Sequence, residues 1–325
     1  MMQHTTWAVP ARTLPVISVA GLQSPDPQAR AAVGRALHAA CSETGFFYCV
    51  DHGVKPELIA AVFAQSRQFF ALPMADRLAV HKNRSPCNRG YEPLRDQTLE
   101  PGTPPDVKEG FYSGPEKPLD DPAVRAGRFN QGPNQWPAAL PDFRAVMSEY
   151  STVMTRLAET LMRGIALSLG LAEDYFAAFC HDPLTTLRLL HYPPQPARPL
   201  PGEKGAGAHT DFGGLTLLLQ DDSGGLQVRA ADGTWLDAAP IPGSFVVNLG
   251  DMIARWTNNR YRSTLHRVIN TSGRERYSVP FFHTGNPDQV IACLPGCVPE
   301  GEAPLWPPVT VEDHLRAMYA RTYGR

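Results

Sequence analysis

The stretch AGAHTDFGGLTLLLQ, residues 206–220, decides the fold and the chemistry that we expect of this chain. Its first part carries His209 and Asp211, and its second part is an apolar run that predicts a buried β-strand over 215–220. In an extended segment, residues two apart point to the same side, so the imidazole and the carboxylate can reach one ion. A His-x-Asp pair is common by chance, and its meaning depends on the residues around it.

Short apolar segments surround this stretch. They cover residues 187–192, 226–228, 245–249, 265–269 and 277–282, and turn sequences rich in Asp, Ser, Ala and Gly separate several of them. Such a spacing of short strands and turns is typical of a β-sandwich or a double-sheet barrel.

The first half of the chain follows a helical pattern around a few short strands. Helices are predicted over about 28–42, from about 56 onward and over about 141–169, with strands at about 14–19 and 46–50. A last helix is predicted over about 311–323, with Thr310 as its N-cap and Asp313 replacing the usual Glu of a capping box. The predicted class is α+β with a β-rich core. Residues 1–180 form a mainly helical region, and residues 181–325 form the barrel and last helix, in one integrated unit.

A long segment rich in Pro, Gly, Asn and Asp covers residues 85–137. A loop of that length inside a compact enzyme is usually either functional or disordered, and we expect it to face a substrate. It contains Arg89, Tyr91, Lys108 and Glu109, which the sequence does not rank as substrate contacts.

A second histidine extends the His-x-Asp pair. His266 lies in the predicted strand 265–269, which can come from elsewhere in a barrel to meet His209 and Asp211. Two His and one carboxylate leave coordination positions open and form the facial triad of non-haem Fe(II) oxygenases, whereas zinc more often takes three His, or Cys. We therefore expect these three residues to hold a ferrous ion.

An anchor for an acid follows in the sequence. Arg276 and Ser278 are two residues apart near the next predicted strand, so their side chains share one face. A guanidinium binds a carboxylate bidentately and a hydroxyl adds a further hydrogen bond. The site thus offers a metal together with a carboxylate anchor.

These motifs resemble those of the isopenicillin N synthase-like branch of the Fe(II)/2-oxoglutarate-dependent dioxygenases. The resemblance rests on residues 209–211, 265–267 and 276–278, and further similar segments lie at 14–17, 45–48, 52–54, 106–111, 189–194, 248–251 and 308–315. It implies a double-stranded β-helix, or jelly roll, flanked by helices. It also implies a co-substrate, 2-oxoglutarate, that chelates the iron while its far carboxylate meets Arg276 and Ser278 and Tyr192 adds a hydrogen bond.

The reaction that the resemblance implies consumes 2-oxoglutarate and O₂ and releases succinate and CO₂ while a small-molecule substrate is oxidised. Hydroxylation is the usual outcome in this family, and desaturation, ring closure and fragmentation are alternatives. Phe212, next to Asp211, and Phe282, four residues beyond Ser278, are expected either to wall the substrate pocket or to belong to the ordinary core.

Two other functions remain open at this point. Some members of the same family are oxidases that use O₂ without 2-oxoglutarate, and in them Arg276 and Ser278 would bind the substrate's own carboxylate. A non-catalytic small-molecule binder on the same barrel is a more remote alternative.

Composition and charge limit the kinds of binding partner that we expect for this chain. The formal net charge is −2 over 325 residues, without a basic run, so nucleic acid is not expected, and nothing demands an obligate protein partner. No apolar run approaches the roughly 18 residues of a membrane span, and the N-terminus lacks the apolar region of a signal peptide. The six cysteines include no C-x-x-C pair. We expect a cytoplasmic enzyme with reduced thiols.

Overall fold

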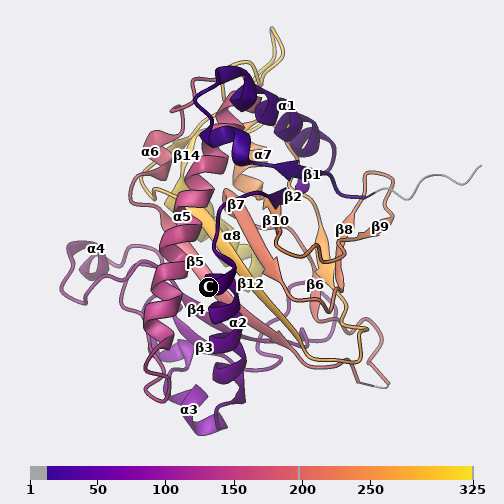
Figure 1. The fold of residues 1–325 in the computed structure, drawn as a ribbon. Helices are drawn as coiled ribbons and strands as arrows, with labels where there is room; N and C mark the ends of the chain where they lie inside the picture. The colour runs from indigo at the N-terminus through magenta and orange to yellow at the C-terminus, as the bar shows by residue number, and fades with distance from the viewer. Residues whose placement is uncertain (1–12, 197, 324–325) are drawn as a thin grey trace, which may run out of the picture.

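Two β-sheets packed against each other form the centre of the fold in a computed structural model that describes residues 13–196 and 198–323 (Figure 1). The larger sheet has eight strands in the spatial order β1 (Val16–Ser18), β2 (Phe46–Val50), β10 (Phe245–Leu249), β7 (Leu215–Gln220), β12 (Arg276–Gly285), β5 (Leu184–Tyr192), β4 (Glu109–Ser113) and β3 (Gly90–Glu92). The smaller sheet has the order β6 (Ala206–His209), β11 (His266–Val268), β8 (Leu226–Arg229) and β9 (Trp235–Asp237). A short pair, β13 (Val290–Ile291) and β14 (Val309–Thr310), lies apart from them.

Alternate residues of the large sheet enter two different hydrophobic clusters. On β2, Phe46 and Tyr48 belong to the cluster between the sheets, whereas Phe47 and Cys49 belong to the cluster under the helices. The two faces of β10 divide in the same way, with Val246 between the sheets. Both faces of these strands are buried, which is why their sequences are mostly apolar and do not alternate with polar residues; the exception is Asn248 on β10.

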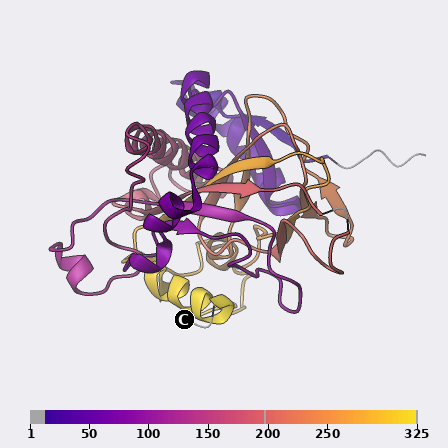
Figure 2. The ribbon, with the colours of Figure 1, turned by 90° about the horizontal axis from the view of Figure 1, so that it is seen from below.

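Helices cover the outer face of the large sheet. The long helices are α1 (Pro27–Glu43), α2 (Pro56–Ala71) and α5 (Phe143–Ser168), and α2 and α5 both contact β5 and β12. Figure 2 shows α8 (Val311–Tyr323), in yellow, on the opposite side of the strands from α2 and α5. Shorter helices are α3 (Met74–Ala79), α4 (Pro122–Arg125), α6 (Ala177–Cys180) and α7 (Asp251–Trp256), with 3₁₀ turns at Ala20–Gln23 and Lys82–Arg84.

The predicted fold class is confirmed: a jelly-roll core is flanked by helices. The predicted strands 46–50, 215–220 and 245–249 match β2, β7 and β10 at both ends, and α1, α5 and α8 lie where helices were expected. Thr310 caps α8 as predicted, because its hydroxyl accepts a hydrogen bond from the Asp313 N–H at 3.1 Å and donates to that residue's carboxylate at 2.7 Å.

The long segment 85–137 is more ordered than the sequence suggested. Residues 90–92 and 109–113 form β3 and β4, which extend the large sheet at its edge by pairing with each other and with β5. These strands are only three and five residues long and contain Gly90 and Gly110, so they carry no strong strand signal. The division at residue 180 stays a prediction.

No helix in the described part of the chain is long and apolar enough to cross a bilayer. Residues 1–12, on which the expectation about a signal peptide depends, lie outside the described residues. All six cysteines are free thiols, as expected.

Candidate active site

Two strands of the small sheet bring the predicted metal ligands together. His209 ends β6 and His266 begins β11, and the two residues are direct cross-strand partners. Their ring centres lie 4.3 Å apart. Asp211 follows two residues after the end of β6, and one ligand atom from each of the three side chains lies within 4.8 Å of the others. The three residues that the sequence singled out therefore form one cluster.

Backbone carbonyls orient both imidazoles. Nδ1 of His209 lies 2.8 Å from the Gly207 carbonyl oxygen, and Nδ1 of His266 lies 3.1 Å from that of Thr264. A carbonyl only accepts, so Nδ1 is the donor in each of these bonds, and Nε2 is the ring nitrogen left to bind a metal. Both Nε2 atoms face Oδ1 of Asp211, at 3.9 Å and 3.8 Å. Such ring-to-carbonyl bonds are the usual support of metal-bound histidines.

The other oxygen of Asp211 is held by two neighbours. Oδ2 accepts a hydrogen bond from the Thr216 hydroxyl at 2.6 Å and one from the Asn248 side-chain amide at 2.7 Å. Thr216 and Asn248 lie on β7 and β10 of the large sheet, where they are cross-strand partners. The two sheets thus fix the carboxylate so that only Oδ1 is directed at the histidines.

The protonation states suit a metal. Burial, assisted by the neighbouring His266, lowers the pKa of His209 to about 3, so its ring is neutral at neutral pH. Burial raises the pKa of Asp211, but the two imidazoles and the hydrogen bonds from Asn248 and Thr216 outweigh it and leave that pKa lowered. Imidazole nitrogens and an ionised carboxylate, without a thiolate, are the donor set of non-haem Fe(II) sites.

Arg276, Ser278 and Tyr192 form a second cluster on β12 and β5. Arg276 is fully buried, its Nε donates to the Gly224 carbonyl at 2.7 Å, and its guanidinium donates to the Ser278 hydroxyl at 3.1 Å. Its guanidinium carbon lies 4.7 Å from the ring centre of Tyr192. No carboxylate of the described residues forms an ion pair with this guanidinium. A buried cation of this kind is suited to receive an acid.

This second cluster shares the space between the sheets with the metal ligands. Tyr192 belongs to the hydrophobic cluster that contains Phe46, and the ring of Phe46 lies 5.3 Å from that of His266. The Arg276 cluster and the cluster of candidate metal ligands are therefore built into one interior.

A cavity of about 560 Å³ opens beside the metal ligands. His209 and Asp211 line it, as do both tentative substrate residues, Phe212 and Phe282. His266, Arg276, Ser278 and Tyr192 are not part of its lining. The cavity therefore reaches two of the candidate metal ligands and is not lined by the Arg276 cluster.

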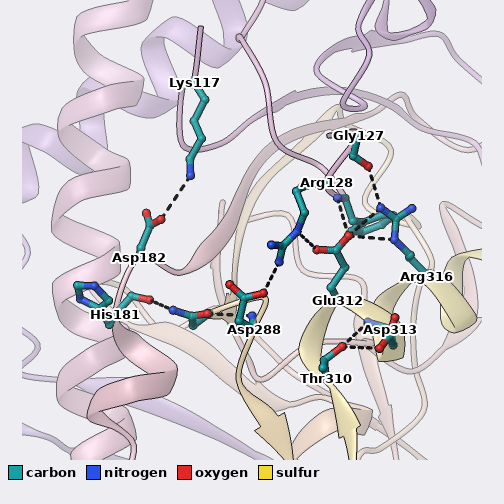
Figure 3. A network of polar contacts seen from close by, with 12 residues as sticks. Lys117, Gly127, Arg128, His181, Asp182, Asp288, Thr310, Glu312, Asp313 and Arg316 are labelled. Carbon is teal, nitrogen blue, oxygen red and sulfur yellow. Dashed lines mark hydrogen bonds and ion pairs between the residues drawn. The ribbon is translucent and has the colours of Figure 1, made fainter. Parts of the chain in front are cut away.

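Residues of α8 and of the segment around residue 128 line one part of this cavity, and Figure 3 shows the polar contacts that join these two segments. Glu312 of α8 accepts from Arg128 at 2.5 Å, from the Phe129 N–H at 3.1 Å and from Arg316 at 2.7 Å. Arg316 also donates to the Gly127 carbonyl at 2.8 Å. Because Phe129 and Arg316 line the cavity, this network fixes one of its walls.

Several lining residues were missed or left unranked by sequence reasoning. Of the four loop candidates only Arg89 lines the cavity, since Tyr91 and Glu109 hydrogen-bond to each other elsewhere and Lys108 pairs with Asp106. Residues that were not anticipated include Tyr112, Arg188 and Tyr319. The sequence could have indicated Arg188, because it is the one charged residue inside the apolar strand 184–192.

Comparisons with known proteins agree with this geometry. Residues 14–139 match the family described as "non-haem dioxygenase in morphine synthesis N-terminal", and residues 183–285 match the "2OG-Fe(II) oxygenase superfamily". The chain is 46% identical to the 2-oxoglutarate-Fe(II) type oxidoreductase hxnY of Emericella nidulans over 96% of this chain and 90% of that protein. It is 40% identical to the 2-oxoglutarate-dependent dioxygenase citB of Monascus ruber, covering 96% of each.

Solved structures show the same similarity. The crystal structure of a full-length Neurospora crassa protein in complex with alpha-KG superposes with a TM-score of 0.84 and 32% identity, over 95% of this chain and 96% of that one. The complex of the same protein with alpha-KG and thymine also gives a TM-score of 0.84, with 31% identity over 95% of this chain and 97% of that one.

Proposed function

Because the chain belongs to the 2-oxoglutarate-Fe(II) oxygenase superfamily, we propose that His209, Asp211 and His266 hold its ferrous ion and that the usual outcome of its reaction is hydroxylation. The protein is an Fe(II)- and 2-oxoglutarate-dependent oxygenase that oxidises a small molecule with O₂. When bound, the ferrous ion and 2-oxoglutarate supply the oxidising power by activating O₂.

We assign these three residues as metal ligands because one donor atom of each points toward the other two. Nε2 of His209, Nε2 of His266 and Oδ1 of Asp211 face one another, while every other polar atom of these side chains has a protein partner. These three ligand atoms are thus left to bind one ion, and the structure gives them no other role.

The remaining proposals concern the co-substrate and the substrate. Arg276 and Ser278 bind the far carboxylate of 2-oxoglutarate, and Tyr192, whose ring packs against the guanidinium, adds a hydrogen bond. Phe212 and Phe282 exclude water from the cavity and contact the substrate. The anchor lies outside the cavity lining, which supports separate places for co-substrate and substrate.

Partners and location also stay proposals. The balanced charge, with a net value of −2, supports a small-molecule substrate without nucleic acid. We extend the proposal to a cytoplasmic enzyme that needs neither a membrane nor an obligate protein partner.

The test is succinate formation by the Fe(II)-loaded protein under air with 2-oxoglutarate. We expect succinate from the wild type even without a primary substrate, slowly, and none from Asp211→Ala, with Asp222→Ala as the matched control because Asp222 is exposed. O₂ uptake on a carboxylate substrate without 2-oxoglutarate would favour the oxidase alternative, and a protein with no affinity for iron would favour the non-catalytic binder.

A further inference from the structure

Arg89 carries a buried charge that the fold leaves without a counter-ion. The residue is 1% exposed, yet it lines the cavity beside His209 and Asp211. Its Nη2 donates to the Asn130 carbonyl at 2.9 Å, and its Nε has no hydrogen-bond partner. The thiol of Cys87 and the phenol of Tyr319 face the guanidinium, and no carboxylate of the described residues pairs with it.

The other charged residues of the cavity differ in this respect. Lys82 pairs with Glu92 and, at 3.3 Å, with Asp96. Arg188 lies 3.6 Å from Glu92, and Arg316 is bound to Glu312 of α8. Arg89 is thus the cavity cation whose charge has no ion-pair partner in the part of the chain that the structure describes.

The surroundings hold this guanidinium in place. A Cβ added at Gly114 would lie 2.2 Å from Nη2 of Arg89, so the absence of a side chain there makes room for the guanidinium. The backbone N–H of Arg89 donates to the Ser85 hydroxyl at 3.1 Å. Burying a guanidinium without an anion is unfavourable, and burial lowers the pKa of Arg89. The guanidinium is therefore a fixed, desolvated and unpaired cation at the wall of a cavity, and such a group is suited to bind an anionic ligand.

We propose that Arg89 is the specificity-determining residue of the substrate cavity and that the primary substrate is a small molecule with a single carboxylate, which Arg89 binds. This inference rests on the proposed function, since it assigns the substrate class of the same site. One unpaired positive charge matches one negative charge, and the carboxylates of Glu92 and Asp96 in the same cavity disfavour a more highly charged anion. The rings of Phe212 and Phe282 in the same lining suit an apolar or aromatic body.

The test compares acids with their neutral amides on the holoenzyme. The wild type, loaded with Fe(II) and 2-oxoglutarate without O₂, is titrated calorimetrically with benzoate, phenylacetate and 1-naphthoate and with the corresponding primary amides. We expect at least one acid to bind at least about 30-fold more tightly than its amide, because truncating one side of a buried charge pair has an effect of this size. Arg89→Gln removes this preference, and Arg89→Lys keeps part of it.

The control is Arg84→Gln, which changes an exposed arginine outside the cavity and is expected to leave the preference unchanged. Equal affinity for every acid and its amide, including the failure of all three acids to bind, would overturn the proposal, as would a preference that survives Arg89→Gln. Affinity for 2-oxoglutarate is measured in the same samples, because an acid that displaces it occupies the Arg276 site and also counts against the proposal.

The proposed function and the proposed role of Arg89 are tested by different measurements, so one can fail without the other. Succinate formed by the wild type from 2-oxoglutarate without a primary substrate tests the oxygenase, and the circular dichroism spectrum of Arg89→Gln shows separately whether the variant is folded. If the wild type forms no succinate, the proposed function fails, and the comparison of acids with amides still decides the role of Arg89.

Discussion

Asn248 donates its side-chain amide to Oδ2 of Asp211 at 2.7 Å, and this contact joins the large sheet to the candidate metal site in the small one. Asn248 is buried, and the bond keeps Oδ1 directed at the two histidines. The orientation of the carboxylate is therefore a property of the sheet packing and does not depend on residue 211 alone.

Removing this contact should weaken metal binding. Asn248→Ala frees one side of Oδ2, and we expect the Fe(II) affinity to fall about 10- to 100-fold, the usual effect of losing a hydrogen-bond partner of a metal ligand. Anaerobic competition with a coloured chelator measures the affinity. Asn83→Ala, at an exposed position, is the matched control, and unchanged affinity in Asn248→Ala would refute this role.

A second contact reaches His209 through a peptide group. Glu100 accepts the Ala208 N–H at 2.8 Å, and the carbonyl of the same peptide unit, that of Gly207, accepts Nδ1–H of His209 at 2.8 Å. The negative charge polarises this peptide and makes its carbonyl a stronger acceptor. The imidazole then becomes a better metal ligand.

The substitution Glu100→Gln keeps an acceptor and removes the charge. We expect Fe(II) affinity to fall about three- to tenfold, less than for a direct partner of a ligand. Glu116→Gln, which alters a carboxylate paired with the exposed Arg144, is the control. Equal metal affinity in Glu100→Gln and wild type, measured with the same chelator, would show that the peptide transmits no effect.

Arg276 should govern the affinity for 2-oxoglutarate. Arg276→Gln removes the buried guanidinium, and we expect the KM for 2-oxoglutarate to rise at least about 30-fold while Fe(II) binding without co-substrate stays unchanged. Arg274→Gln, at a largely exposed position nearby, is the control. If the variant instead raises only the KM for the primary substrate, the guanidinium binds that substrate and the oxidase alternative gains support.

The stability that the contacts of α8 give to the fold should depend on pH, because these contacts include the carboxyl of Glu312. Burial raises the pKa of this carboxyl, but hydrogen bonds from Arg128, Arg316 and the Phe129 N–H outweigh it, so the pKa is lowered from its ordinary 4.5. The folded protein therefore favours the ionised form more than the unfolded chain does. The resulting stability is complete above pH 4.5 and is lost as the pH falls toward the lowered pKa.

Urea unfolding of wild type and Glu312→Gln measures this effect. We expect the free energy of unfolding of the variant to be lower than that of the wild type by about 1–2 kcal/mol at pH 7, and the effect is this modest because the partners of Glu312 are partly exposed. The difference should shrink below the ordinary pKa of the carboxyl. Asp288→Asn, which removes only the exposed partner of Arg128, is the control. A difference that is the same at pH 7 and pH 3.5 would contradict the assignment.

The fold and the grouping of His209, Asp211 and His266 were predictable because these parts of the sequence carry local signals. Strand 215–220 is a continuous apolar run, and Thr310 with Asp313 marks the start of α8. His209 and Asp211 share a face in any extended segment, so only the position of His266 required the tertiary structure.

The cavity beside His209 and Asp211 was less predictable, because its walls come from distant segments. Arg89 is charged and lies in a loop, so its sequence context resembles that of a solvated residue, and only the fold shows that it is buried without a carboxylate partner. Tyr112 and Arg188 face the same cavity because β4 pairs with β5, and β4 begins with Glu109 and Gly110, so it lacks the apolar run that marks β2 and β10.

The central claim is that one metal ion binds to His209, Asp211 and His266, and anaerobic crystals soaked with Mn(II), which accepts similar ligands, test it most directly. We expect a single anomalous peak bonded to Nε2 of both histidines and to Oδ1 of Asp211, absent from crystals of Asp211→Ala. A peak at other residues, or no peak at a site where all three side chains are ordered, would contradict the claim.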